Sequence, residues 1–190
     1  MPLYRVLLVL IILDLLLLGF TATLGITLDG REALMRHFSM GLLSSSFTCF
    51  IHVLCLFYLI GTGKDVRDAI EDHEDLRARF LPWTRVQKRR VFPPACFAIA
   101  LIIVATLMGG EVHSRILAVD GGQTLPLRGV TAWWIHLMLV ILAVAASGWA
   151  FWAEVTTLKE NRRGIEELNR ELESRGSTAT DCPPKNQVVS

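Results

Sequence analysis

Four long apolar stretches constrain this chain more than any other feature of its sequence. Each holds about 20 residues or more, enough at ~1.5 Å rise per residue to cross a hydrocarbon core of ~30 Å. Lipid offers no hydrogen bonds to a bare backbone, so such stretches must be helical. The stretches are Val6–Ile26, Phe38–Gly63, Phe92–Gly110 and Gly129–Ala153, and Asp14 is the only charged residue within them. The sequence therefore predicts an all-α integral membrane protein with four spans.

We expect these spans to pack as an antiparallel four-helix bundle made by residues 1–153, because short connections join neighbouring antiparallel helices. The predicted spans are about 6–26, 40–62, 93–110 and 131–153. Helices 2 and 4 are predicted to extend into the cytoplasm. In the second extension, apolar residues recur at helical spacing and predict an amphipathic helix over 154–175. Residues 176–190 are predicted to be a disordered tail.

The first extension is predicted from Val66, Ile70 and Leu76, which lie at roughly helical spacing after span 2. We expect helix 2 to continue to Leu81-Pro82, and a basic segment to follow. Pro93-Pro94 would then lie in the first turn of helix 3, where proline is tolerated.

Positive charge is distributed unevenly between the two predicted sides of the membrane. One side receives residues 1–5, 64–91 and the tail, with fifteen Lys and Arg residues, whereas the other side receives four. This bias places both termini in the cytoplasm. It indicates a bacterial inner membrane protein. The alternative is a cleaved signal peptide ending near Thr21-Ala22-Thr23, but Asp14 is unusual inside such a segment.

A buried polar pair is predicted near the middle of the bundle. Asp14 and His52 each lie about ten residues from the cytoplasmic end of their spans, so antiparallel neighbours would bring them to the same depth. An ionisable group at mid-span costs about 2.5–3.5 kcal/mol on insertion scales, which a partner reduces. Such a pair could join two helices, relay protons, or support a bound ligand.

The second candidate site is a layer of histidines and methionines at the predicted outer end. His37 precedes span 2, His113 follows span 3, and His136 lies near the start of span 4. The methionines of the same layer are Met35, Met40, Met108 and Met138. Imidazole and thioether ligands suit haem iron or copper. One b-type haem, with His136 and either His113 or His37 as axial ligands, is one hypothesis. Copper held by the three histidines with Met108 or Met138 is another, and headgroup contact without any cofactor is the third.

Other classes of function find little support in the sequence. The net charge of +1 gives no reason to expect a nucleic-acid partner. The four cysteines include no C-x-x-C pair, so a thiol-redox enzyme is not expected. Gly61-Thr62-Gly63-Lys64 lacks the spacing of a phosphate-binding loop. No hydrolase or metalloprotease motif is present.

Three functions remain as hypotheses. The first is a redox or electron-transfer subunit with one haem or metal near the outer face. The second is a non-catalytic structural or assembly subunit, which would bind other subunits of a membrane complex through the cytoplasmic helices. The third is a small proton-coupled transporter that uses Asp14 and His52. Because four spans are few for a transporter, the third would require a homo-oligomer.

Overall fold

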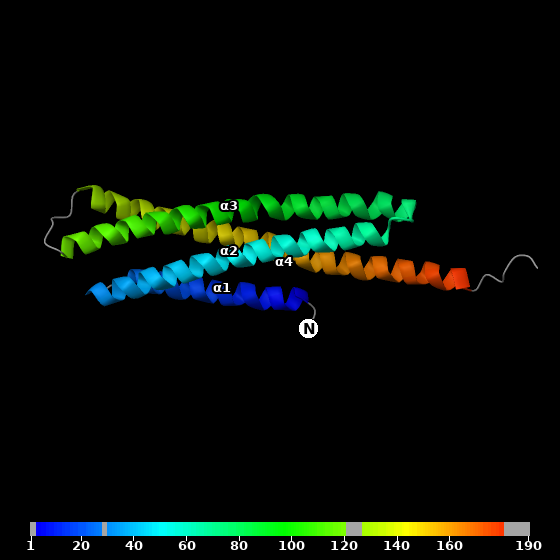
Figure 1. The fold of residues 1–190 in the computed structure, drawn as a ribbon, viewed down its shortest axis with the longest axis horizontal. Helices are drawn as coiled ribbons and strands as arrows, with labels where there is room; N and C mark the ends of the chain where they lie inside the picture. The colour runs from blue at the N-terminus through cyan, green and yellow to red at the C-terminus, as the bar shows by residue number, and fades with distance from the viewer. Residues whose placement is uncertain (1–2, 28–29, 121–126, 181–190) are drawn as a thin grey trace, which may run out of the picture.

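Four long helices make up almost all of the computed structural model, which describes residues 3–27, 30–120 and 127–180. They are α1 (Leu3–Ile26), α2 (Gly30–Ala69), α3 (Glu74–Asp120) and α4 (Leu127–Thr180) (Figure 1). Each contains a stretch long and apolar enough to cross a membrane. The predictions of an all-α protein and of four helices long and apolar enough to span a membrane are therefore confirmed. Of the predicted disordered tail, residues 176–180 belong to α4, and residues 181–190 lie outside the described residues.

The helices lie lengthwise beside one another (Figure 1). The most extensive contact is between α3 and α4, while α2 contacts all three other helices and α1 contacts α2 and α4. Beyond the N-terminal end of α1, the other three helices continue together (Figure 1). We call residues 64–91 and 155–175 the stalk. Its first turns still pack on α1, since Leu158 shares a core cluster with Leu7 and Arg162 lies over the Tyr4 ring. The C-terminal ends of α1 and α3 and the N-terminal ends of α2 and α4 lie at the opposite end (Figure 1).

The stalk corrects the predicted boundary between helices 2 and 3. Helix α2 ends at Ala69, the backbone N–H of His73 donates to the carbonyl of Ile70 at 3.1 Å, and α3 begins at Glu74. The prediction that helix 2 continues to Leu81-Pro82 is therefore wrong. Pro82, Pro93 and Pro94 lie inside α3 rather than at its start.

An apolar cluster explains this outcome. Five buried side chains, each at most 3 % exposed, pack together around the turn. They are Val66 near the end of α2, Ile70 directly after it, Leu76 and Phe80 near the start of α3, and Leu168 of α4. The apolar spacing that resembles one continuous helical face in fact belongs to two helices that meet around a turn. A hairpin buries these side chains against α4, which a single straight helix could not do.

Ion pairs between α3 and α4 line the outside of the stalk. Arg79 reaches Glu167 and Glu171, and Arg90 lies 2.7 Å from Glu160. These side chains are exposed, so each pair contributes at most about 1 kcal/mol. The predicted extension of the fourth helix thus packs on α3 as well as on α2.

Small residues at the contact between α3 and α4 let the two helices approach closely. The contact is made by Ala98, Ala105, Ala143, Ala146 and Ala150, all at most 7 % exposed. Close backbone approach through small side chains is typical of helices in membranes. Many large apolar side chains point outward. Among them are Leu16, Phe57, Leu107 and Trp152, each more than 60 % exposed. Such an exterior fits a lipid environment.

Candidate proton site

Two ionisable side chains meet in the interior where α2 faces α4. His52 Nδ1 lies 2.8 Å from Glu154 Oε1, and both side chains are 0 % exposed. His52 lies well inside the second apolar stretch, whereas Glu154 immediately follows the fourth. The pair shares one proton: either imidazolium faces carboxylate, or neutral imidazole faces carboxylic acid. In both forms the net charge of the pair is zero, which is the cheapest state for a buried group.

Neighbouring side chains hold the pair in place. The His52 ring stacks on Phe151 with ring centroids 4.3 Å apart and an interplanar angle of 21°. The Cys55 thiol, one turn along α2 from His52, contacts the Glu154 carboxyl group. Both Cys55 and Phe151 are buried, so the walls of the site are apolar. The second atoms, His52 Nε2 and Glu154 Oε2, have no hydrogen-bond partner among the described residues.

A second carboxyl group, Asp14 of α1, lies close enough to interact electrostatically with His52. Its side chain is 0 % exposed, and its Oδ1 atom lies 2.9 Å from the hydroxyl of Thr48, one turn from His52 on α2. Helix α3 carries no charged residue between Val91 and Gly110. The site therefore contains three titratable groups from three helices, with His52 between the two carboxyl groups, together with the thiols of Cys49 near Asp14 and Cys55 near Glu154.

The geometry around Thr48 favours a protonated Asp14. Thr48 Oγ1 lies 2.9 Å from Asp14 Oδ1 and 2.8 Å from the carbonyl oxygen of Ser44. A hydroxyl has one proton and can donate to only one of these oxygens. When Asp14 is protonated, its O–H donates to Thr48 while Thr48 donates to Ser44, and both contacts become hydrogen bonds. An ionised Asp14 would leave one contact without a proton.

These contacts change the predicted pairing. Asp14 and His52 are both buried, as expected, but the structure gives each a different direct partner: Thr48 for Asp14 and Glu154 for His52. From the sequence, Glu154 is expected at the start of the cytoplasmic helix and outside the buried pair. Its signal was present: Ser147, Ala150, Glu154, Thr157 and Asn161 recur on one helical face of α4.

The predicted outer histidines lie near one another at the opposite end of the helices. His37 Nδ1 lies 3.2 Å from the Thr21 carbonyl oxygen, and His136 Nδ1 lies 3.1 Å from that of Ala105. A carbonyl oxygen only accepts, so both Nδ1 atoms must carry a proton, and in the neutral imidazole the Nε2 atom keeps a lone pair. His113 stacks on Phe38 with ring centroids 4.5 Å apart.

Glycines make room for the two hydrogen-bonded rings. A Cβ atom at Gly25 would lie 2.8 Å from Cε1 of His37, and one at Gly109 would lie 2.8 Å from Cε1 of His136. The two histidines lie within electrostatic range of each other, as do His37 and His113. In the part of the chain that the structure describes, no three His, Cys, Asp or Glu side chains form a metal-binding group. The copper set with Met108 or Met138 stays a prediction.

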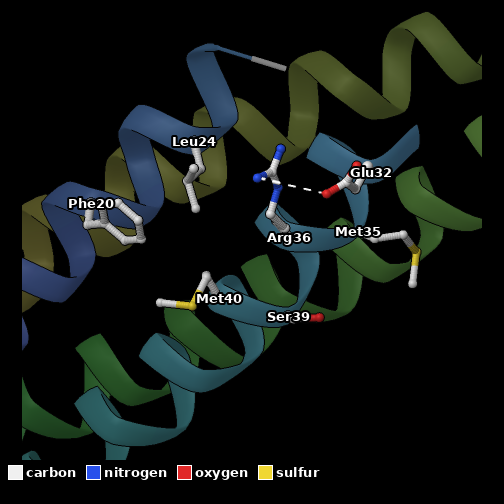
Figure 2. Close-up of a pocket in the computed structure, with 7 residues that line it drawn as sticks. All are labelled: Phe20, Leu24, Glu32, Met35, Arg36, Ser39 and Met40. Atoms are coloured by element: carbon white, nitrogen blue, oxygen red, sulfur yellow. Dashed lines mark ion pairs between the residues drawn. The ribbon is translucent and has the colours of Figure 1, made fainter. Parts of the chain in front are cut away.

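A pocket of about 430 Å³ opens between α1 and α2 at this end (Figure 2). In Figure 2 the Arg36 guanidinium points toward Glu32, 4.0 Å away, and both side chains are exposed. The lining residues are Phe20, Leu24, Glu32, Met35, Arg36, Ser39 and Met40. The lining includes two of the predicted methionines but no histidine, so this pocket offers no imidazole ligand.

Comparison of the chain with protein-family models, with curated proteins and with solved structures finds no match.

Proposed function

We propose that this protein binds and releases protons inside the membrane, as the proton-coupled step of a small transporter. The observation that carries the proposal is the contact between His52 and Glu154, both fully buried, on two membrane-spanning helices. Ionisable groups inside a membrane are costly to bury, and they mark proton and ion pathways. A structural role alone would be served at lower cost by uncharged polar side chains.

The number of protons bound at the site sets its net charge. With two protons shared among Asp14, His52 and Glu154, the net charge is zero; with one proton it is −1, and with three it is +1. A low-dielectric interior favours the neutral state, in which the Thr48 geometry holds one proton on Asp14 and the second lies between His52 and Glu154. Loss of the second proton leaves a net negative charge, which a cation or a new proton must balance. The site thus couples proton release to the arrival of positive charge.

The proposal includes an arrangement in the membrane. The four helices form an antiparallel transmembrane bundle, with both termini and the stalk on the cytoplasmic side of a bacterial inner membrane. The support is the excess of Lys and Arg in the stalk and tail. Because four spans are few for a transporter, we expect the working unit to be a homodimer.

Proton flux into proteoliposomes tests the proposal directly. Purified protein is reconstituted with a pH-sensitive dye inside the vesicles, and a potassium gradient with valinomycin sets the membrane potential. We expect faster acidification than in protein-free vesicles, and a drop of about tenfold or more in the Glu154→Gln variant, since removal of a proton-transferring group typically costs this much or more.

Glu160→Gln is the matched control. Glu160 lies on the same helix, but it is 43 % exposed and pairs with Arg90 in the stalk. This variant makes the same chemical change outside the site and should keep the wild-type flux. Equal flux in the Glu154→Gln and wild-type proteins, or wild-type flux no faster than that of empty vesicles, would contradict the proposal.

A second candidate function, a redox protein with one b-type haem, is favoured by the outer histidines. His37 and His136 each donate Nδ1–H to a backbone carbonyl and keep the Nε2 lone pair. This is the arrangement of metal-ligating histidines, whose other nitrogen is fixed by a hydrogen bond. His37 and His136, with His113 as the alternative, would hold the haem, which would supply one-electron chemistry.

The test of this second function is a reduced-minus-oxidised visible spectrum of protein purified from haem-supplied cells. We expect a sharp b-type band that disappears in His136→Ala and persists in His73→Ala, a change in the stalk turn. A spectrum without the band, or a band unchanged in variants of all three outer histidines, would contradict haem binding.

A further inference from the structure

Polar side chains from three helices lie near one level on the stalk side of the proton site. Asn161 of α4 is 1 % exposed, and its Nδ2 atom donates to Thr62 Oγ1 of α2 at 3.0 Å. Gln87 of α3 is 4 % exposed and lies less than one turn from Arg90, whose NH1 is 2.7 Å from Glu160, the neighbour of Asn161. Thr62, Gln87 and Asn161 therefore lie at one level, and we call them the polar collar.

Thr157 lies between the collar and Glu154. Glu154, Thr157 and Asn161 are spaced three and four residues apart, so they share one face of α4. All three are at most 1 % exposed. At ~1.5 Å rise per residue, this face carries polar groups over about 10 Å from Glu154 to the collar. A hydrophobic helix face would be expected here if the segment served only to pack.

Several polar atoms along this face lack a partner within the protein. Thr157 Oγ1, Gln87 Nε2 and Glu154 Oε2 are buried and have no hydrogen-bond partner among the described residues. Each buried polar atom without a partner costs about 1–3 kcal/mol. Native proteins avoid this cost with buried water molecules, which need two to four polar partners. These three atoms, with the Asn161 amide, offer such partners in sequence.

The side of the site away from the stalk differs. The buried hydroxyls of Ser44 and Ser147, and the half-buried hydroxyl of Thr106, each donate to the carbonyl three or four residues earlier in their own helix. They therefore need no water. On that side, and outside the proton site, His113 Nδ1 is the one buried side-chain nitrogen or oxygen of the described residues without a hydrogen-bond partner. It lies beyond the third apolar stretch.

We propose that a file of water molecules connects the stalk end to Glu154 through the polar collar and past Thr157. The His52–Glu154 pair then exchanges its proton from the stalk side only, and the self-bonded hydroxyls on the other side form the barrier. This inference rests on the proposed proton function, and it adds the direction and the route of access.

Cysteine accessibility tests the path without measuring transport. In a background with the native cysteines replaced by serine, Thr157→Cys is compared with Ser147→Cys, a site on the same face of α4 that is equally buried. Proteoliposomes are treated with silver ion, a small thiol-reactive cation that can follow water. We expect reaction at position 157 to be about tenfold faster or more, and only when the ion is added on the stalk side.

The outcomes separate the path from the proton function. Equal reaction rates at 157 and 147, or reaction at 157 from the opposite side, would overturn the path while leaving the flux test of Glu154 standing. Fast one-sided reaction at 157 together with normal flux in Glu154→Gln would support the path and overturn the proton function.

A second measurement uses isosteric variants. Thr157→Val and Gln87→Met remove the polar atoms but keep the side-chain size, so the fold should be retained. We expect proton flux to fall about fivefold or more in each, with a steeper dependence on the pH of the stalk side. Thr156→Val, at the neighbouring residue whose exposed hydroxyl donates to the Trp152 carbonyl, should keep wild-type flux. Wild-type flux and an unchanged pH profile in both Thr157→Val and Gln87→Met would overturn the path.

Discussion

His52 and Glu154 are 102 positions apart in the chain, yet their side chains are in contact at 2.8 Å with neither exposed. This contact joins α2 to α4 within the apolar interior. His52 Nδ1 and Glu154 Oε1 are each other's hydrogen-bond partners, so removal of either side chain leaves the other without this bond. The stability of the helix packing is therefore linked to the same pair that we propose transfers the proton.

Removal of one partner should destabilise the protein strongly. Glu154→Leu leaves His52 buried without a partner, and His52→Leu does the same to Glu154; breaking a buried pair typically costs about 3–5 kcal/mol. The double variant should recover much of this loss, since neither polar group remains. The measurement is the free energy of unfolding in mixed micelles with increasing SDS. Additive losses in the double variant would show that the two side chains are not coupled.

The hydrogen bond between Thr48 and Asp14 predicts a different result. Asp14→Asn keeps a donor for Thr48, as the protonated carboxyl group does, so we expect a change in unfolding free energy below about 1 kcal/mol. Thr48→Val leaves Asp14 without a partner and should cost about 1–3 kcal/mol. Proton flux should be lost in Asp14→Asn although the protein stays folded. Normal flux in this variant would exclude Asp14 from the proton site.

The inward position of Glu154 could not be predicted from the sequence, although the four apolar helices could. Hydropathy predicted four helices long and apolar enough to cross a membrane, and the structure has four, because length and apolar content decide whether a helix can do so. It could not place Glu154, the first charge after the fourth span, because a charge at that position is equally consistent with a solvated helix end. Whether it points inward depends on the rotation and axial offset of α4 against α2, which apolar content does not determine.

The stalk shows a similar limit. Periodicity assigned Val66, Ile70 and Leu76 to one helix, whereas the chain turns between Ala69 and Glu74. A helical repeat read across a tight turn can continue by coincidence, since the residues on both sides of the turn face the same third helix. Only the packing against α4 distinguishes the two arrangements.

The tip of the stalk predicts a pH dependence. Asp75 lies at the start of α3, far from the apolar stretch of that helix, and Arg175 NH1 donates to its Oδ1 atom at 3.1 Å. The hydrogen bonds from Arg175 lower the pKa of Asp75 below its ordinary value of 3.8. A carboxyl group whose pKa is lower in the folded state stabilises that state above its unfolded pKa. The contribution disappears as the pH falls through the folded pKa.

We therefore expect Asp75→Asn to lower the thermal unfolding temperature slightly at neutral pH, with the difference from wild type closing below about pH 4. The difference should also shrink at high salt, because both side chains are exposed. Asp72→Asn, in the α2–α3 turn, controls for the loss of a negative charge. A difference that grows on acidification would contradict the assigned ion pair.

Gly164 and Trp83 predict the consequence of one added methyl group. A Cβ atom at Gly164 would overlap the Trp83 indole ring, which packs directly on the α4 backbone, whereas a Cβ atom at Gly148 has no heavy atom within 4 Å. Overpacking typically costs about 1–3 kcal/mol, while alanine in a helix interior is favoured over glycine by about 1 kcal/mol. Gly164→Ala should thus destabilise the protein, and Gly148→Ala should be neutral or stabilising, in the same SDS unfolding measurement. Trp83→Leu combined with Gly164→Ala should remove the overlap and make the alanine less harmful than it is beside Trp83. If Gly164→Ala were as stable as Gly148→Ala, Trp83 would not be packed on Gly164, and the contact between α3 and α4 at this level would have to be different.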